Sequence, residues 1–325
     1  MTVTELANGV IAGDRRSLAR AITLVESARA DHRALALSLL ATVRETGRQA
    51  LRIGLSGTPG VGKSTFVESF GLMLTGQGLR VAVLAVDPSS ARSGGSILGD
   101  KTRMDRLSRD PLAFIRPSPS QTHLGGVARR TREAVALCEA AGFDVVLIET
   151  VGVGQSETVV AELCDLFVLL LAPGGGDELQ GVKRGIMEIA DLIAVNKADG
   201  DLLAAARRTC GDYAGALGLL RKRPQDPPGF PKAMTVSAAE ARGISDVWTE
   251  ITDLTNWRRD QGVFAARRAE QALHWFEDEV RQGLVARLTA NPKVRAQMET
   301  LGREVQAGLS PSQAAARLLA MLADE

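Results

Sequence analysis

Gly57-Thr58-Pro59-Gly60-Val61-Gly62-Lys63-Ser64-Thr65 follows directly on an apolar run of strand length, residues 51–56. The nine residues match the pattern G-x-x-x-x-G-K-[ST], in which glycines let the backbone wrap closely around phosphate groups. The amides at the start of the following helix then face the phosphate oxygens. We expect all nine residues to contact a nucleotide, Lys63 to reach its β- and γ-phosphates, and the Ser64 hydroxyl to bind Mg²⁺.

The period of the apolar residues on either side of this loop indicates the fold class. Apolar runs of strand length alternate with helical stretches, and a continuous apolar strand is typical of a parallel sheet that is covered on both faces. We therefore predict an α/β fold of the P-loop NTPase type, with a mostly parallel sheet and helices on both faces. The expected strands are 51–56, 80–86, 114–115, 145–149, 166–172, 192–196 and 233–237.

A second motif, Asn196-Lys197-Ala198-Asp199, ends the expected strand 192–196. It resembles the N-K-x-D element with which GTPases select guanine. A carboxylate such as that of Asp199 accepts hydrogen bonds from N1–H and the 2-amino group of guanine, which adenine lacks. Asn196 would orient the loop and the stem of Lys197 would cover the base. Ser237-Ala238, after the last expected strand, resembles the short element whose backbone N–H contacts the guanine oxygen.

Carboxylates at strand ends are candidates for a magnesium site beside the phosphate loop. Glu149 ends the expected strand 145–149, where it would hold Mg²⁺ directly or through water, and Gly152 would offer its N–H to the γ-phosphate. Most GTPases have Asp at the position of Glu149, and the longer side chain favours contact through water. Asp87 and Asp100 are further candidate ligands, and each could instead be an ordinary helix cap.

The termini differ in pattern from the central part, which we predict to be a GTPase domain over residues 50–262. Residues 1–49 show helical spacing, with Asp14 as a candidate N-cap, and are expected to form a helical extension. Residues 263–325 are expected to be wholly helical, with an apolar stripe that must be buried. It could fold back on its own domain or pack against a second copy, and we expect a homodimer.

Composition excludes several classes of protein. The 325 residues are 45% hydrophobic and 24% charged, with a net charge of +1, so neither nucleic acid nor a membrane is expected as a partner. We expect no secretory signal and no apolar run long enough to span a bilayer. The three cysteines are widely separated and read as small apolar residues, which suits a reducing, cytoplasmic location.

Beyond these general motifs, the chain resembles the MeaB/ArgK/MMAA family of GTPases over about residues 15–290. The resemblance rests on the phosphate loop and on five further stretches: 86–90, 94–104, 124–128, 149–157 and 173–180. It implies a GTPase of the SIMIBI class that is homodimeric through its C-terminal helices. It also implies a chaperone of adenosylcobalamin-dependent methylmalonyl-CoA mutase that gates cofactor loading and protects or reactivates the mutase. Within the family, residues 174–183 correspond to an additional mobile switch, from which Lys183 would reach the nucleotide when the mutase is bound.

The expected reaction is attack of water on the γ-phosphorus of GTP, which yields GDP and phosphate. Lys63, Mg²⁺, Glu149 and backbone donors would position the groups and neutralise charge. Val153 follows Gly152, so the usual water-positioning Gln is absent at that place, and we expect slow turnover that a partner accelerates. Three alternatives stay open: a kinase of basic amino acids, a metal-delivery GTPase and a signal-recognition-type targeting GTPase.

Overall fold

The computed structural model describes residues 2–27, 29–86, 104–117, 124–150, 156–174, 184–220, 223 and 225–323. The chain divides into two compact units, Met1–Arg268 and Ala269–Glu325. The first contains the sheet and both motifs, and the second is helical. Within the described ranges, no helix is long and apolar enough to cross a membrane.

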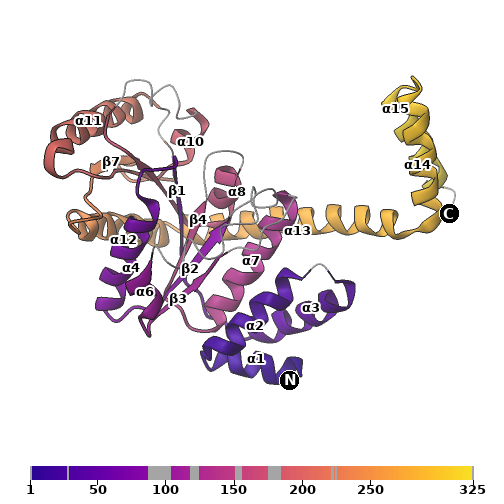
Figure 1. The fold of residues 1–325 in the computed structure, drawn as a ribbon, viewed down its shortest axis with the longest axis horizontal. Helices are drawn as coiled ribbons and strands as arrows, with labels where there is room; N and C mark the ends of the chain where they lie inside the picture. Colours follow the sequence, from indigo (N-terminus) through magenta and orange to yellow (C-terminus); the bar gives the residue numbers. More distant parts are fainter. Residues whose placement is uncertain are drawn as a thin grey trace. The chain divides into compact units, whose positions relative to one another are not determined.

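The described part of the first unit contains a seven-stranded, wholly parallel sheet in the order β3-β2-β4-β1-β5-β6-β7 (Figure 1). The predicted α/β class is confirmed. All six residues of β2 are buried, as are those of β4 and β5, because helices cover both faces of the sheet. The strands are β1 (Leu51–Gly57), β2 (Val81–Val86), β3 (Ala113–Arg116), β4 (Val145–Thr150), β5 (Leu166–Leu171), β6 (Leu192–Val195) and β7 (Lys232–Thr235).

One face of the sheet packs against α4 (Lys63–Gly76), α6 (Asp105–Arg109) and α12 (Ile244–Asp260). Phe66 and Phe70 of α4 stack with ring centroids 5.4 Å apart, and both are fully buried. Burial of a side chain of this size contributes roughly 1.5–3 kcal/mol, so α4 is held firmly against the strands. This matters for the site because the phosphate loop leads directly into α4.

The other face packs against α7 (Leu124–Ala140), α8 (Ser156–Leu163), α10 (Arg184–Ile189) and α11 (Leu203–Leu219), which follows a short 3-10 turn, η1 (Gly200–Leu202). Three N-terminal helices, α1 (Val3–Ile11), α2 (Arg15–Glu26) and α3 (Ala30–Arg44), pack in turn on α7. Asp14 caps α2 by accepting a hydrogen bond from the Ser17 amide at 2.7 Å, as its sequence position predicts.

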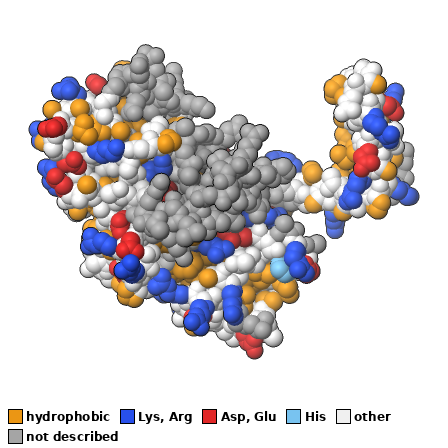
Figure 2. Space-filling view, viewed as in Figure 1, with side chains coloured by type: hydrophobic (Ala, Val, Ile, Leu, Met, Phe, Trp, Pro, Cys, Tyr) orange, Lys and Arg blue, Asp and Glu red, His pale blue; other side chains and the backbone are white. Residues whose placement is uncertain are grey.

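The second unit holds most of α13 (Val263–Ala290), together with α14 (Pro292–Gln306) and α15 (Pro311–Ala323), which pack against each other. Asn291 caps α14 and Pro292 occupies its first position, where the missing N–H costs no hydrogen bond. Several large apolar side chains of this unit are exposed, and orange side chains mark this segment in Figure 2. They are Leu273, Phe276, Val280, Leu284, Val285, Met298 and Leu319.

Candidate functional site

The phosphate loop lies between the carboxyl end of β1 and the start of α4, and two of its glycines are required by geometry. Gly62 has φ +88°, in the left-handed region, and a Cβ atom there would lie 2.7 Å from the Asn196 side-chain nitrogen. A Cβ atom on Gly57 would lie 2.3 Å from the carbonyl oxygen of Leu170 on β5. At these two positions the phosphate loop therefore presents backbone atoms with no side chain, and we refer to this loop as the cradle.

Donors converge on this cradle. The first hydrogen bond inside α4 runs from the Phe66 amide to the Gly62 carbonyl at 2.9 Å, so the amides of residues 63–65 find no acceptor within the helix. The Lys63 ammonium donates to the carbonyl oxygens of Gly57 at 2.6 Å and Thr58 at 3.2 Å. The Lys63 ammonium and the positive end of a helix dipole thus lie at the same loop, which suits a polyphosphate.

Asn196 joins this loop to the segment after β7. Asn196 is 2% exposed, and its Nδ2 donates to the carbonyl oxygens of Val61 at 2.9 Å and Gly62 at 3.5 Å. Its Oδ1 accepts the N–H of Ala238 at 3.0 Å. The first residue of the second motif therefore holds the phosphate loop and residues 237–238 together.

The other residues of the second motif lie beside the same loops. Lys197 has φ +57° and donates from its ammonium to the Gly60 carbonyl at 2.6 Å, so its stem spans from the motif to the phosphate loop. The Asp199 carboxylate accepts a hydrogen bond from the Ser237 hydroxyl, which in turn accepts the N–H of Glu240 at 3.2 Å. The structure thus brings both motifs and the Ser237-Ala238 element into one place.

Glu149 and Ser64 are the described candidates for holding Mg²⁺. Glu149 is buried at the carboxyl end of β4, where it pairs in register with Leu55 of β1 and Ala85 of β2. Ser64 lies half-buried in the first turn of α4. A carboxylate and a hydroxyl are hard oxygen donors of the kind that Mg²⁺ prefers, so the residues present fit this ion. Within the part of the chain that the structure describes, no three His, Cys, Asp or Glu side chains form a metal-binding group.

Four residues with predicted roles lie outside the described residues: Asp87, Asp100, Gly152 and Lys183. Their assignments stay predictions.

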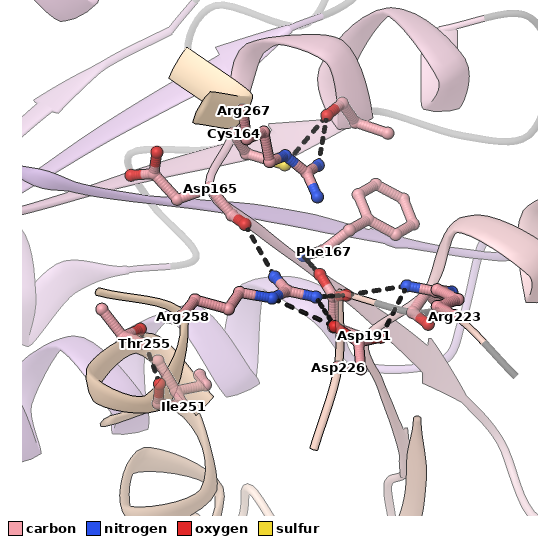
Figure 3. Close-up of polar contacts among 12 residues, drawn as sticks. Cys164, Asp165, Phe167, Asp191, Arg223, Asp226, Ile251, Thr255, Arg258 and Arg267 are labelled. Carbon is pink, nitrogen blue, oxygen red and sulfur yellow. Dashed lines mark hydrogen bonds and ion pairs between the residues drawn. The ribbon is translucent and has the colours of Figure 1, made fainter. Parts of the chain in front are cut away.

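Sequence reasoning missed a buried charge cluster at the amino ends of β5 and β6 (Figure 3). Arg258 of α12 donates to Asp191 at 2.7 Å, to Asp226 at 2.5 Å and to the carbonyl oxygen of Asp165 at 3.1 Å. Burial by itself would raise the pKa of Asp191, but the nearby arginines, Arg258 foremost, outweigh it and hold that pKa below 3.8. The cluster pins α12 to the sheet at the edge opposite the phosphate loop. Its members are too widely spaced in the chain to form a recognisable motif.

A second missed contact lies within the site itself. The Ser69 hydroxyl of α4 donates to the carbonyl oxygen of Ala238 at 2.6 Å. A single serine inside a helix carries no sequence signal, and the two residues are 169 positions apart.

Comparison with known proteins agrees with this geometry. Residues 18–293 match the family described as "Methylmalonyl Co-A mutase-associated GTPase MeaB". A GTPase from Caulobacter vibrioides is 53% identical over 321 residues, which cover 98% of each chain. The mitochondrial methylmalonic aciduria type A homologue of Mus musculus is 49% identical over 98% of this chain and 79% of its own.

Among solved structures, a protein titled as the LAO/AO transport system kinase superposes with a TM-score of 0.76 and 38% identity. The match covers 98% of this chain and 97% of that one.

Proposed function

This chain belongs to the MeaB family of methylmalonyl-CoA mutase-associated GTPases, and from that premise we propose that it is a chaperone of an adenosylcobalamin-dependent methylmalonyl-CoA mutase. The chain is a GTPase. Its hydrolytic cycle would gate the loading of the mutase with its cofactor and protect or reactivate the mutase. The observation that carries the proposal is the family match over residues 18–293, whose description names the mutase.

The contacts around the phosphate loop support a division of labour in GTP hydrolysis. Lys63 would exchange its bonds to the Gly57 and Thr58 carbonyls for the β- and γ-phosphates, while the backbone N–H groups of residues 63–65 at the start of α4 bind phosphate oxygens. Asp199 would accept the N1–H and 2-amino groups of guanine, with Asn196 keeping the two loops in register. Positioning and charge neutralisation are the main catalytic resources in phosphoryl transfer.

Ser64 and Glu149 would hold Mg²⁺, which, when bound, supplies positive charge to the phosphate oxygens. Glu149 lies on β4, which pairs with β1, so its backbone position is fixed by the sheet and does not depend on the ordering of a loop.

The second unit supports a homodimer. Leu273, Phe276, Val280 and Leu284 recur at intervals of three and four residues along α13, and each is at least 45% exposed. Side chains at this spacing share one face of a helix. Such an apolar face is stabilised when a second copy covers it, as the family resemblance implies. We place this homodimer in the cytoplasm.

A kinase of basic amino acids is the second candidate, because the superposable solved structure is titled as a transport system kinase. The two candidates differ in the fate of the γ-phosphate. Radiolabel from γ-labelled GTP that appears on arginine, lysine or ornithine would favour the kinase, whereas label in free phosphate favours the GTPase chaperone.

Co-purification with the mutase tests the proposed function. The full chain is mixed with a cobalamin-dependent methylmalonyl-CoA mutase in GDP or in a non-hydrolysable GTP analogue, and the mass of the complex is measured by light scattering. We expect a complex whose mass or stoichiometry depends on the nucleotide. The Asn196→Ala variant, which loses the bridge between the two loops, should abolish that dependence. No complex in either nucleotide would contradict the proposal.

A further inference from the structure

The peptide between Ala238 and Ala239 is held by α4, the helix that follows the phosphate loop. The Ser69 hydroxyl donates to the Ala238 carbonyl at 2.6 Å, and Ser69 is itself half-buried. In a trans peptide the C=O and the next N–H point in opposite directions, so a bond that fixes the Ala238 carbonyl also fixes the Ala239 N–H. Ser69 therefore directs the Ala239 N–H away from α4.

The sequence predicts that a backbone N–H of Ser237-Ala238 contacts the guanine oxygen, but both of these N–H groups are already engaged within the protein. The Ser237 N–H donates to the Arg242 carbonyl at 2.9 Å. The Ala238 N–H donates to Asn196 Oδ1 at 3.0 Å, and the Glu240 N–H donates to the Ser237 hydroxyl at 3.2 Å. Among the residues that the structure describes, the Ala239 N–H between them has no acceptor, and Ala239 is exposed while Ala238 is buried. One outward donor is thus left on a segment that Asp199 contacts through Ser237.

We propose that Ser69 is a positioning residue for base recognition, which aims the Ala239 N–H at the C6 oxygen of guanine. This inference rests on the proposed guanine site, because Asp199 would read the N1–H and 2-amino edge of the same base. Guanine carries an acceptor at C6 where adenine carries an amino group, so a fixed N–H donor at that point favours guanine and opposes adenine. Ser69 would never touch the nucleotide, and its effect would pass through one peptide unit.

The test compares GDP with 6-thio-GDP, in which a weakly accepting sulfur replaces the C6 oxygen. Dissociation constants are measured by calorimetry for the full chain and for Ser69→Ala. We expect the wild-type protein to prefer GDP, and we expect Ser69→Ala to shrink the ratio of the two constants by about 2- to 10-fold, the range of one net hydrogen bond. Affinity for 6-thio-GDP should change less than GDP affinity. Ser69→Thr, which keeps the hydroxyl, should restore the ratio.

Thr75→Ala is the matched control. Thr75 also lies on α4, and its hydroxyl donates to the distant Asp110 carboxylate at 2.7 Å, a different segment from residues 237–240. This variant should lower thermal stability and leave the GDP preference unchanged.

Two different results would overturn the inference. If Ser69→Ala weakens the binding of GDP and 6-thio-GDP equally, or leaves the ratio of their dissociation constants at the wild-type value, Ser69 has only a structural role. The proposed guanine site would still stand. If the wild-type protein binds GDP no more tightly than ADP, the proposed guanine site itself fails, and the role of Ser69 fails with it.

Discussion

Replacing Asn196 with alanine should weaken the binding of GDP by about 30-fold or more. Asn196 makes two short side-chain hydrogen bonds, to the Val61 carbonyl at 2.9 Å and from the Ala238 N–H at 3.0 Å. Each such bond contributes about 1 kcal/mol net, and a sum of about 2 kcal/mol corresponds to roughly 30-fold in affinity. Val61 and Ala238 are 1% and 3% exposed, so water cannot readily replace the lost partners.

The loss should appear in affinity because Asn196 joins two loops that the nucleotide also joins. Without this bridge, the binding of the nucleotide must order the phosphate loop and residues 237–238 at its own cost. The phosphate loop serves any nucleotide, so the residual affinity for ADP should fall as well. A loss of ADP affinity therefore distinguishes Asn196→Ala from a change at Asp199, because in our proposal Asp199 contacts the base of the nucleotide and no other part of it.

Calorimetric titration of the variant with GDP measures the effect. Asn291→Ala is a suitable control, because it removes an asparagine that caps α14 by accepting the Lys293 N–H at 3.0 Å, in the other compact unit. It should leave GDP affinity unchanged. A dissociation constant for Asn196→Ala within about threefold of the wild-type value would refute the bridging role.

Three further predictions concern the base, the charge cluster and the thiols. Asp199→Asn should weaken the binding of GDP by about 10- to 100-fold and favour the binding of xanthosine diphosphate. The reason is that the amide donates to the 2-oxygen of xanthine, whereas the carboxylate accepts from the 2-amino group of guanine. Competition binding measures both affinities, and an unchanged preference would count against the assignment. Asp191→Asn should lower the free energy of unfolding by about 3 kcal/mol near neutral pH, because it leaves Arg258 buried with one partner fewer. The pKa of Asp191 is held below its unfolded value of 3.8, so the stabilisation by its carboxylate is complete above pH 3.8 and is lost as the pH falls below it. Urea unfolding should therefore show a smaller difference in stability between Asp191→Asn and the wild-type protein at about pH 3 than at about pH 7. An equal difference at both pH values would contradict the reasoning. Burial raises the pKa of the Cys164 thiol to about 12 and raises the pKa of the Cys138 thiol further. A thiol reagent should therefore label half-buried Cys210 in the folded protein and label Cys138 and Cys164 only after unfolding. Peptide mapping measures which cysteines are labelled.

Two contiguous motifs made the nucleotide-binding part of this fold predictable. The phosphate loop and Asn196–Asp199 each lie at a strand end, and in a parallel sheet the carboxyl ends of the strands share one edge. Their meeting in space therefore follows from the fold class together with the period of the apolar runs. The ends of the strands lie within about two residues of the predicted ends, because a continuous apolar run marks where a buried strand begins and ends.

The remaining contacts could not be predicted because they depend on packing between distant segments. Ser69 contacts Ala238 only because the fold brings α4 next to the segment that follows β7. Arg258 and Asp191 are 67 positions apart, and nothing in the sequence distinguishes them from arginines and aspartates that lie at the surface. Burial converts them into a fixed cluster, and burial is decided by the whole fold.

Titration of one protein sample with GTP and with ATP, in the presence of Mg²⁺, tests the central claim most directly. The account predicts that GTP binds at least about 100-fold more tightly than ATP, because Asp199 and the peptide after Ala238 match the edge of guanine and oppose that of adenine. Equal affinity for the two triphosphates, or binding of neither, would contradict it.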